Sequence, residues 1–120
     1  DCFHCHGTQM FTDNLFHNNG IDTEPFIDLG LGEVTEDLSD YGKFKTPTLR
    51  NIEFTPPYMH DGRFSTLEEV IEHYDNGGHY SSTIDPLMKK LGIGLLLTNQ
   101  EKQDLIAFLL TLSDIEFITE

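Results

Sequence analysis

Two cysteines and a histidine stand close together at the start of the sequence, at a spacing that can do chemistry. The first seven residues read DCFHCHG and place Cys2, Cys5 and His6 in a C-x-x-C-H pattern, and the chain contains no other cysteine. The pattern is compatible with a redox-active dithiol, with part of a zinc site, or with covalent attachment of haem. The histidine directly after the second cysteine helps to rank these three chemistries.

Covalent haem attachment fits the pattern best. A thioredoxin-like dithiol needs a strand before it to form a βα turn, and one residue precedes Cys2. A zinc site needs four ligands, which Cys2, Cys5, His6 and His4 could supply only in a cramped arc. In a c-type haem site, the two thiols bond to the macrocycle and the adjacent imidazole binds the iron. We therefore predict haem c, with a zinc site or free cysteines as the alternatives.

Length and charge limit the function classes. The chain has 120 residues, of which 38% are hydrophobic, and this is enough for one core, so we predict a single domain over residues 1–120. The formal net charge of -14 argues against nucleic acid as a partner. No run of 18 apolar residues predicts a membrane span, and no leader precedes Cys2. Cytochrome c folds carry a helix before the attachment motif, so we expect a longer parent chain.

Two helices are indicated by their capping residues and apolar spacing. Residues 65–78 begin with Thr66 and Glu69 in a capping box and end at a glycine pair. The apolar positions of this helix share one face, which aims Tyr74 inward: Leu67, Val70, Ile71 and Tyr74. A second helix is predicted from Thr98 onward, with a capping box to Glu101 and an apolar stripe: Leu105, Phe108, Leu109 and Leu112.

The rest of the sequence predicts loops. Residues 17–45 are acidic and punctuated by glycine, with one short helical turn expected around residues 35–40. No alternating pattern of useful length predicts a strand. The expected class is mainly α, with long irregular loops and a need for an internal filler such as haem.

Residues 44–64 read FKTPTLRNIEFTPPYMHDGRF and lack a helical or strand period. The segment is too apolar for a solvated linker, so we expect it to line a ligand. Arg50 and Arg63 are suited to the propionate carboxylates of a haem. For Arg63, a surface ion pair with the chain's own carboxylates is an equally good expectation.

At this point the sequence resembles a known family. CFHCHG, followed by FKTPTLRNIEFTPPYMHDGRFSTLEEVIEHYDNGG, is similar to the C-terminal haem domain of the bacterial di-haem cytochrome c peroxidase and MauG family. The resemblance implies a cytochrome c-like domain whose partner, an N-terminal haem domain that reacts with peroxide, is missing here. It also implies a calcium ion at the interface of the two domains.

The resemblance assigns roles to individual residues. It implies that Cys2 and Cys5 form the thioethers and that His6 is the proximal iron ligand. Thr55 and Pro57 match positions whose backbone carbonyls bind calcium, which prefers oxygen ligands. His60 matches a loop histidine near the haem, and we group it with Arg50 as cofactor-binding.

The second axial position departs from the peroxidase pattern. Where the peroxidases carry Met in this helix, the sequence has Tyr74, as MauG-type members do. An anionic phenolate favours ferric iron, whereas a thioether favours ferrous iron. A core aromatic with a hydrogen-bonded hydroxyl is the alternative for Tyr74. Met59 and Met88 are rival ligands, and His4, His17, His73 and His79 are expected to bind no metal.

The functional prediction is a periplasmic c-type haem domain that passes electrons to a peroxide-reducing partner haem and is inactive alone. Its expected partners are the missing domain, a small electron-donor protein, hydrogen peroxide in the full protein, and a second copy in a homodimer. One alternative is a MauG-like His/Tyr haem enzyme that oxidises a protein or small substrate. The other is a non-catalytic domain with zinc-bound or free cysteines.

Overall fold

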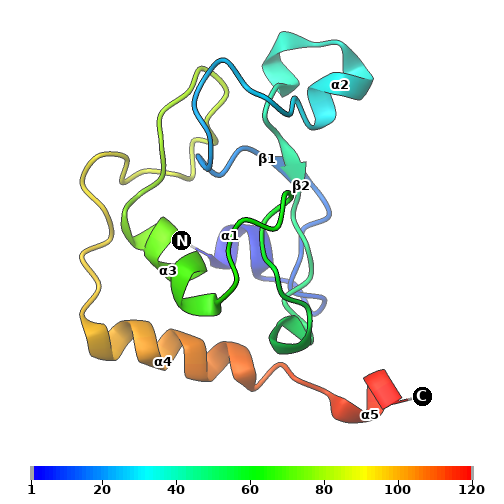
Figure 1. Ribbon diagram of the computed structural model, residues 1–120, viewed down its shortest axis with the longest axis vertical. Helices are drawn as coiled ribbons and strands as arrows, with labels where there is room; N and C mark the ends of the chain where they lie inside the picture. Colours follow the sequence, from blue (N-terminus) through cyan, green and yellow to red (C-terminus); the bar gives the residue numbers. More distant parts are fainter. Residues whose placement is uncertain (1, 120) are drawn as a thin grey trace.

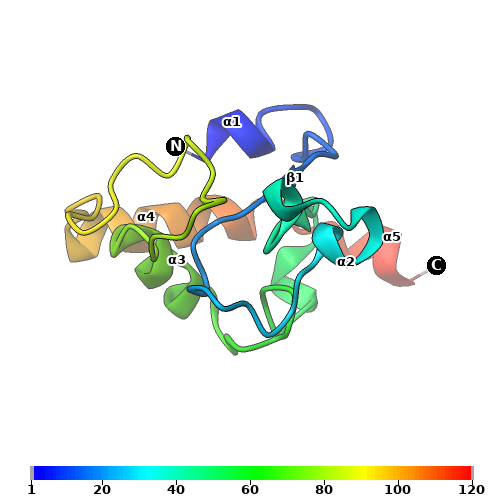
Figure 2. The same ribbon diagram turned by 90° about the horizontal axis from the view of Figure 1, so that it is seen from above.

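Helices joined by long loops are the main regular elements of the computed structural model, which describes residues 2–119 (Figure 1). The helices and strands are α1 (Phe3–His6), β1 (Phe16–His17), α2 (Leu31–Thr35), β2 (Phe44–Lys45), α3 (Leu67–Asp75), α4 (Asn99–Leu110) and α5 (Ile115–Thr119). Short 3-10 helices cover Leu38–Asp40 and Ile52–Phe54. In Figure 2, α3 and α4 lie on one side of the molecule, α2 and α5 on the other, and α1 at the upper edge.

Helix α3 forms where its capping residues predict it. The Thr66 hydroxyl accepts a hydrogen bond from the Glu69 amide at 3.2 Å, which satisfies a free donor of the first turn. The helix ends before Gly77, whose φ of 89° lies in the left-handed region. A Cβ at Gly77 would also lie 2.2 Å from the Lys90 carbonyl oxygen, so this turn requires glycine. The predicted helix is confirmed.

Helix α4 also begins at its predicted cap. The Thr98 side chain accepts from the Glu101 amide, and the Glu101 carboxylate accepts from the Thr98 amide at 2.7 Å. The apolar stripe of α4 is less enclosed than that of α3, because Leu105 and Phe108 are exposed. Contacts with α3 and with residues 52–54 cover only part of this helix.

Residues 17–45 are more ordered than the sequence indicates. His17 pairs with Phe44, and Phe16 with Lys45, in a two-residue antiparallel ladder. Strands this short leave no alternating pattern to detect. The helical turn expected at residues 35–40 is present as the 3-10 helix at 38–40, and α2 precedes it.

The hydrophobic core is thin. Only Ile21, Leu67 and Ile71 are buried hydrophobic residues within the described range. The radius of gyration is 14.7 Å, somewhat more than the roughly 13.6 Å expected for a compact domain of this length. Within residues 2–119, no helix combines the length and apolar character needed to cross a membrane.

Candidate functional site

The C-x-x-C-H motif lies on α1, the short helix that opens the chain. The Cys2 carbonyl accepts hydrogen bonds from the Cys5 amide at 3.2 Å and the His6 amide at 2.9 Å. This helical turn places the side chains three and four residues after Cys2 on the same face as Cys2. Both cysteines are free thiols, with Cys2 exposed and Cys5 half-buried.

A backbone carbonyl orients the imidazole of His6. His6 Nδ1 lies 2.7 Å from the Phe11 carbonyl oxygen, which can only accept a hydrogen bond. Nδ1 is therefore the protonated nitrogen, and Nε2 keeps the lone pair that a metal requires. A hydrogen bond of this kind also fixes the orientation of a ligating imidazole.

Tyr74 on α3 approaches the same region from another element. The residue is half-buried, and loss of solvent around its hydroxyl raises the pKa of Tyr74. The Asn19 side-chain amide donates a hydrogen bond to the hydroxyl at 3.0 Å and opposes this rise. Ionisation of Cys2 or Cys5 would raise the pKa of Tyr74 further.

Asn19 contacts two of the residues that the sequence analysis named as candidates for the second axial ligand. Its side-chain amide contacts Met59 Sδ at 3.6 Å as well as the Tyr74 hydroxyl. His73 donates to the Asn19 carbonyl at 3.0 Å, so α3 holds this residue at two points. The neutral form of His73 is favoured because burial lowers its pKa. Sequence reasoning did not identify Asn19.

The residues present fit a c-type haem. Two thiols, a histidine with its Nε2 available and a buried tyrosine hydroxyl come from α1 and α3. This donor set matches the chemistry of haem attachment and axial ligation. A large apolar cofactor would also complement a fold in which so few hydrophobic residues are buried.

Arg50 and Arg63 differ in their contacts. Arg50 is exposed and donates to the Gln9 carbonyl at 3.0 Å, three residues beyond the attachment motif. Arg63 forms ion pairs with Asp22 at 2.9 Å and Asp61 at 2.8 Å. The surface ion pair expected as the alternative for Arg63 is therefore confirmed.

The remaining predicted site residues lie on the same loop segment. The imidazole of His60 stacks on Phe44, with ring centroids 3.6 Å apart and an interplanar angle of 7°. It lies 4.0 Å from the Asp28 carboxylate, and only 12% of its side chain is exposed. Thr55 and Pro57 are exposed residues of this segment.

His17 lies between two carboxylates, an arrangement that the sequence did not predict. Its Nε2 lies 2.7 Å from the Asp13 carboxylate, and its Nδ1 lies 2.5 Å from the Asp85 carboxylate. Burial favours the neutral imidazole, but the hydrogen bonds to both carboxylates outweigh burial and raise the pKa of His17. The sequence left open whether His17 faces solvent or is hydrogen-bonded, and its partners could not be predicted because Asp85 lies 68 residues away.

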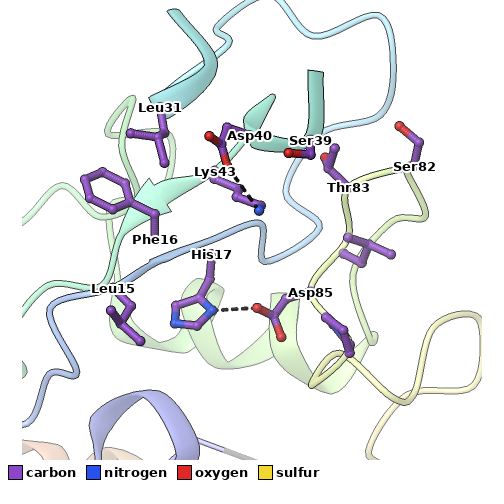
Figure 3. A pocket seen from close by; sticks show the side chains of 12 residues that line it. Leu15, Phe16, His17, Leu31, Ser39, Asp40, Lys43, Ser82, Thr83 and Asp85 are labelled. Atoms are coloured by element: carbon purple, nitrogen blue, oxygen red, sulfur yellow. Dashed lines mark hydrogen bonds and ion pairs between the residues drawn. The ribbon is translucent and has the colours of Figure 1, made fainter. Parts of the chain in front are cut away.

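A pocket of about 530 Å³ lies beside this histidine (Figure 3). Lys43 and Asp40 pair on one side of it at 3.3 Å, and His17 and Asp85 pair on the other. The pocket is separate from the attachment motif, because none of Cys2, Cys5 and His6 lines it.

Comparisons with known proteins give a consistent set of relatives. The chain is 48% identical over 87 residues to the cytochrome-c peroxidase IdrP1 of Pseudomonas sp. strain SCT, a match that covers 72% of the chain and 22% of that protein. It is 38% identical over 113 residues to the methylamine utilization protein MauG of Methylorubrum extorquens, covering 92% of the chain and 30% of MauG. No family model matches the chain.

The fold has solved counterparts. The crystal structure of a MauG-like protein associated with microbial copper homeostasis superposes with a TM-score of 0.84 at 40% identity, over 96% of the chain and 40% of that structure. The diheme peroxidase BthA of Burkholderia thailandensis superposes with a TM-score of 0.74 at 20% identity, over 95% of the chain and 39% of that structure, which shows the fold alone. The chain thus spans well under half the length of these proteins.

Proposed function

The chain belongs to the family of the di-haem cytochrome c peroxidases and MauG, and on this premise we propose that it is the C-terminal haem domain of a peroxidase-family oxidoreductase. In this proposal, residues 1–120 form one cytochrome c-like domain that holds one haem c. Cys2 and Cys5 provide the thioethers, and His6 provides the proximal ligand. The domain passes electrons to a peroxide-reducing haem in the part of the protein that this chain does not include.

The geometry of His6 is the observation that carries the proposal. The hydrogen bond from Nδ1 to the Phe11 carbonyl at 2.7 Å leaves Nε2 as the ligating nitrogen. Haem c, when bound, supplies one-electron transfer at its iron, and the identity of the axial ligands tunes its potential. The protein's part is to fix the imidazole and to exclude water around it.

We propose Tyr74 as the second axial ligand. In its present surroundings the hydroxyl stays protonated, because burial raises its pKa. A ferric ion would compensate the buried phenolate charge that is otherwise unfavourable. Asn19, which donates to the same oxygen at 3.0 Å, would remain as a positioning residue. Met59, which contacts the same amide, is the rival ligand.

Haem attachment and ligation can be tested together. We expect the chain to show a c-type pyridine haemochrome when it is produced with the haem-attachment machinery, and Cys2→Ser with Cys5→Ser to abolish it. In the haem-loaded chain, Tyr74→Phe should change the ferric optical spectrum, whereas Met59→Leu should leave it unchanged. Absence of haem from the unmodified chain would contradict the whole proposal. If only Met59→Leu changes the spectrum, Met59 and not Tyr74 is the second axial ligand.

A second candidate function is a MauG-like oxidation of a protein or small substrate. The observation that favours it is Tyr74, because an anionic ligand disfavours the ferrous state that an electron relay uses. The similarity to MauG at 38% identity supports the same candidate. Redox titration of the haem-loaded chain separates the two functions. A Tyr74→Met variant should raise the midpoint potential if the phenolate is the ligand, and an unchanged potential would argue against it.

The remaining parts of the proposal concern partners. We propose a calcium ion at the domain interface, with the backbone carbonyls of Thr55 and Pro57, both exposed residues, supplying part of its oxygen ligands. We also propose that the protein works in the periplasm, with a small electron-donor protein and as a homodimer. Because the peroxide-reacting haem lies outside this chain, the isolated domain should reduce hydrogen peroxide poorly. If the haem-loaded chain reduced peroxide at the rate of a complete enzyme, the assignment of peroxide reduction to the other haem domain would be refuted.

A further inference from the structure

A single side-chain atom of Asn19 contacts both Tyr74 and Met59, the proposed second axial ligand and its rival. Asn19 Nδ2 lies 3.0 Å from the Tyr74 hydroxyl oxygen and 3.6 Å from Met59 Sδ. All three residues are half-buried. They come from the loop after β1, from the loop before α3 and from α3 itself, so only the tertiary structure brings them together.

The Met59 sulfur identifies which atom of the amide faces the two side chains. A thioether sulfur can accept a hydrogen bond but has no proton to donate. The amide nitrogen of Asn19, and not its oxygen, therefore faces the sulfur, and the same nitrogen faces Tyr74. Because an amide nitrogen carries two hydrogens, Asn19 can donate one N–H to each acceptor.

The hydrogen bond to Tyr74 suits the ionised form of the side chain. The Tyr74 oxygen is the acceptor, so the bond does not use the phenol proton and strengthens when that proton is lost. A hydrogen bond to the charged form favours that form, and Asn19 accordingly lowers the pKa of Tyr74 against the effect of burial. The Met59 sulfur gains no charge, and the second N–H competes with a metal for its electron pairs.

The backbone of Asn19 is fixed relative to the helix that carries Tyr74. His73, the preceding residue on α3, donates from Nε2 to the Asn19 carbonyl at 3.0 Å. The next carbonyl, that of Gly20, accepts from the His79 amide at 2.7 Å. The amide of Asn19 is therefore already in place for the Tyr74 oxygen and needs no rearrangement to meet it.

The backbone of Met59 is fixed as well. Its φ of 73° lies in the left-handed region, which is uncommon for a residue other than glycine. The turn is closed by the Gly62 amide, which donates to the Met59 carbonyl at 3.3 Å, and by a bridge between Tyr58 and Phe64. Loss of the Asn19 amide would therefore free the Met59 side chain without displacing its backbone.

We propose that Asn19 selects the second axial ligand, an inference that rests on the proposed function. One N–H stabilises the phenolate oxygen of Tyr74, and the other engages the sulfur of Met59. The phenol proton leaves to solvent when Tyr74 binds the iron, and no electron is transferred. Asn19 is thus a positioning residue, because it does not bind the iron but decides which side chain does.

Asn19→Leu in the haem-loaded chain tests the selection, because leucine has a similar size but no donor. We expect Met59 to replace Tyr74. The ferric spectrum should then gain the far-red band of a methionine-ligated haem, and the midpoint potential should rise, as for Tyr74→Met. The ratio of tyrosine-ligated to methionine-ligated ferric chain should fall by at least about 10-fold, the loss expected for one hydrogen bond to a charged group.

Two further variants keep the test independent of this one substitution. Asn19→Asp retains the shape of the side chain, but its carboxylate has no N–H and repels a phenolate, so the same change is expected. Asn19→Leu combined with Met59→Leu should show no methionine band. Its potential should return to that of the unmodified chain or fall below it, because a phenolate without a hydrogen bond donates more strongly to the iron.

Thr83→Val is the matched control for loosening of the structure around Asn19. The Thr83 hydroxyl accepts from the side chain of the neighbouring Asn18 at 3.0 Å and donates to the Tyr41 carbonyl at 2.6 Å. Thr83→Val should lower the urea midpoint but leave the ferric spectrum and the potential unchanged. If it changes them as Asn19→Leu does, the amide of Asn19 is not the cause and the proposal is wrong.

The proposal is also wrong if Asn19→Leu and Asn19→Asp leave the spectrum and the potential unchanged. A lower potential without a methionine band would refute it too, because the amide would then tune the phenolate without choosing the ligand. Tyr74→Phe separates these failures from failure of the proposed ligation. If Tyr74→Phe leaves the ferric spectrum unchanged, Tyr74 is not the ligand and both are refuted. If only the Asn19 variants have no effect, Tyr74 remains the ligand and the role of Asn19 alone is refuted.

Discussion

Replacing His17 with Asn should destabilise the protein in a pH-dependent way. In the folded protein, the imidazole links Asp13 and Asp85, and the side chains of all three residues are only 17–19% exposed. Hydrogen bonds to charged groups contribute roughly 1.5–3 kcal/mol each. Allowing for partial exposure, the two bonds together should contribute about 3 kcal/mol to the free energy of unfolding. His17→Asn removes this contribution and leaves two carboxylates without their common donor.

The pH dependence follows from the raised pKa of His17. Hydrogen bonds to the two carboxylates raise it above 6.5, its value in an unfolded chain. The stabilisation is therefore fully present below about pH 6.5 and is lost as the pH rises through the higher pKa of the folded state. One proton changes the free energy of unfolding by at most about 1.4 kcal/mol per pH unit. The difference in the free energy of unfolding between the unmodified chain and His17→Asn should therefore narrow as the pH rises from about 6 to about 9.

Urea unfolding of the haem-loaded chain in the presence of EDTA measures this difference. In the haem-loaded chain, Cys5 has no ionisable thiol that could add to the pH dependence. EDTA removes any bound divalent metal ion. His79→Asn is the matched control, because His79 is exposed, and its effect should be small at each pH. A stability difference for His17→Asn that is the same across the whole range would refute the reasoning. In that case the folded and the unfolded chain would release the His17 proton at the same pH, and the pKa of His17 would not be raised.

Variants at three further positions test, by urea unfolding, which interactions hold the helices in place. Thr98→Ala should lower the free energy of unfolding by about 1 kcal/mol, because it removes the capping box of α4. Thr98→Ser keeps a capping hydroxyl and should lose much less stability. Gly94→Ala should lower the free energy of unfolding by about 3 kcal/mol. Gly94 has a φ of 85°, and a Cβ there would lie 2.3 Å from the Asp75 carbonyl oxygen. An unchanged midpoint would contradict either expectation. Lys102→Met should cost less than Gly94→Ala, and its effect should vanish at about 1 M salt, because Lys102 joins α4 to Asp75 through a partly exposed ion pair.

The helices with local signals were predictable. Thr66 and Thr98 each accept a hydrogen bond from an amide three residues later, and this depends on a stretch of four residues. The spacing of Leu67 and Ile71 likewise indicated the buried face of α3. Helix α2 was not predicted, because its N-cap residue, Gly30, has no side chain that could make a capping hydrogen bond. The expectation of a loop there was therefore only partly correct.

The residues of the candidate site also fall into those that the sequence predicted and those that it did not. The roles proposed for Cys2, Cys5 and His6 could be predicted from their spacing, because haem attachment and a single helical turn both depend on a few neighbouring residues. The sequence also predicted that Tyr74 faces inward, and in the structure Tyr74 is half-buried with its hydroxyl hydrogen-bonded to Asn19. Which residue meets that hydroxyl was not predictable, since Asn19 is 55 residues away.

By itself, the sequence determined what depends on neighbours along the chain: the attachment motif, the two capped helices and the inward face of α3. Tertiary structure alone decided that Asn19 joins Met59 and Tyr74, and that His17 lies between Asp13 and Asp85. The reason is physical. Local hydrogen bonds and helical periodicity are encoded in short segments, whereas a contact between distant residues exists only when loop closure brings them together.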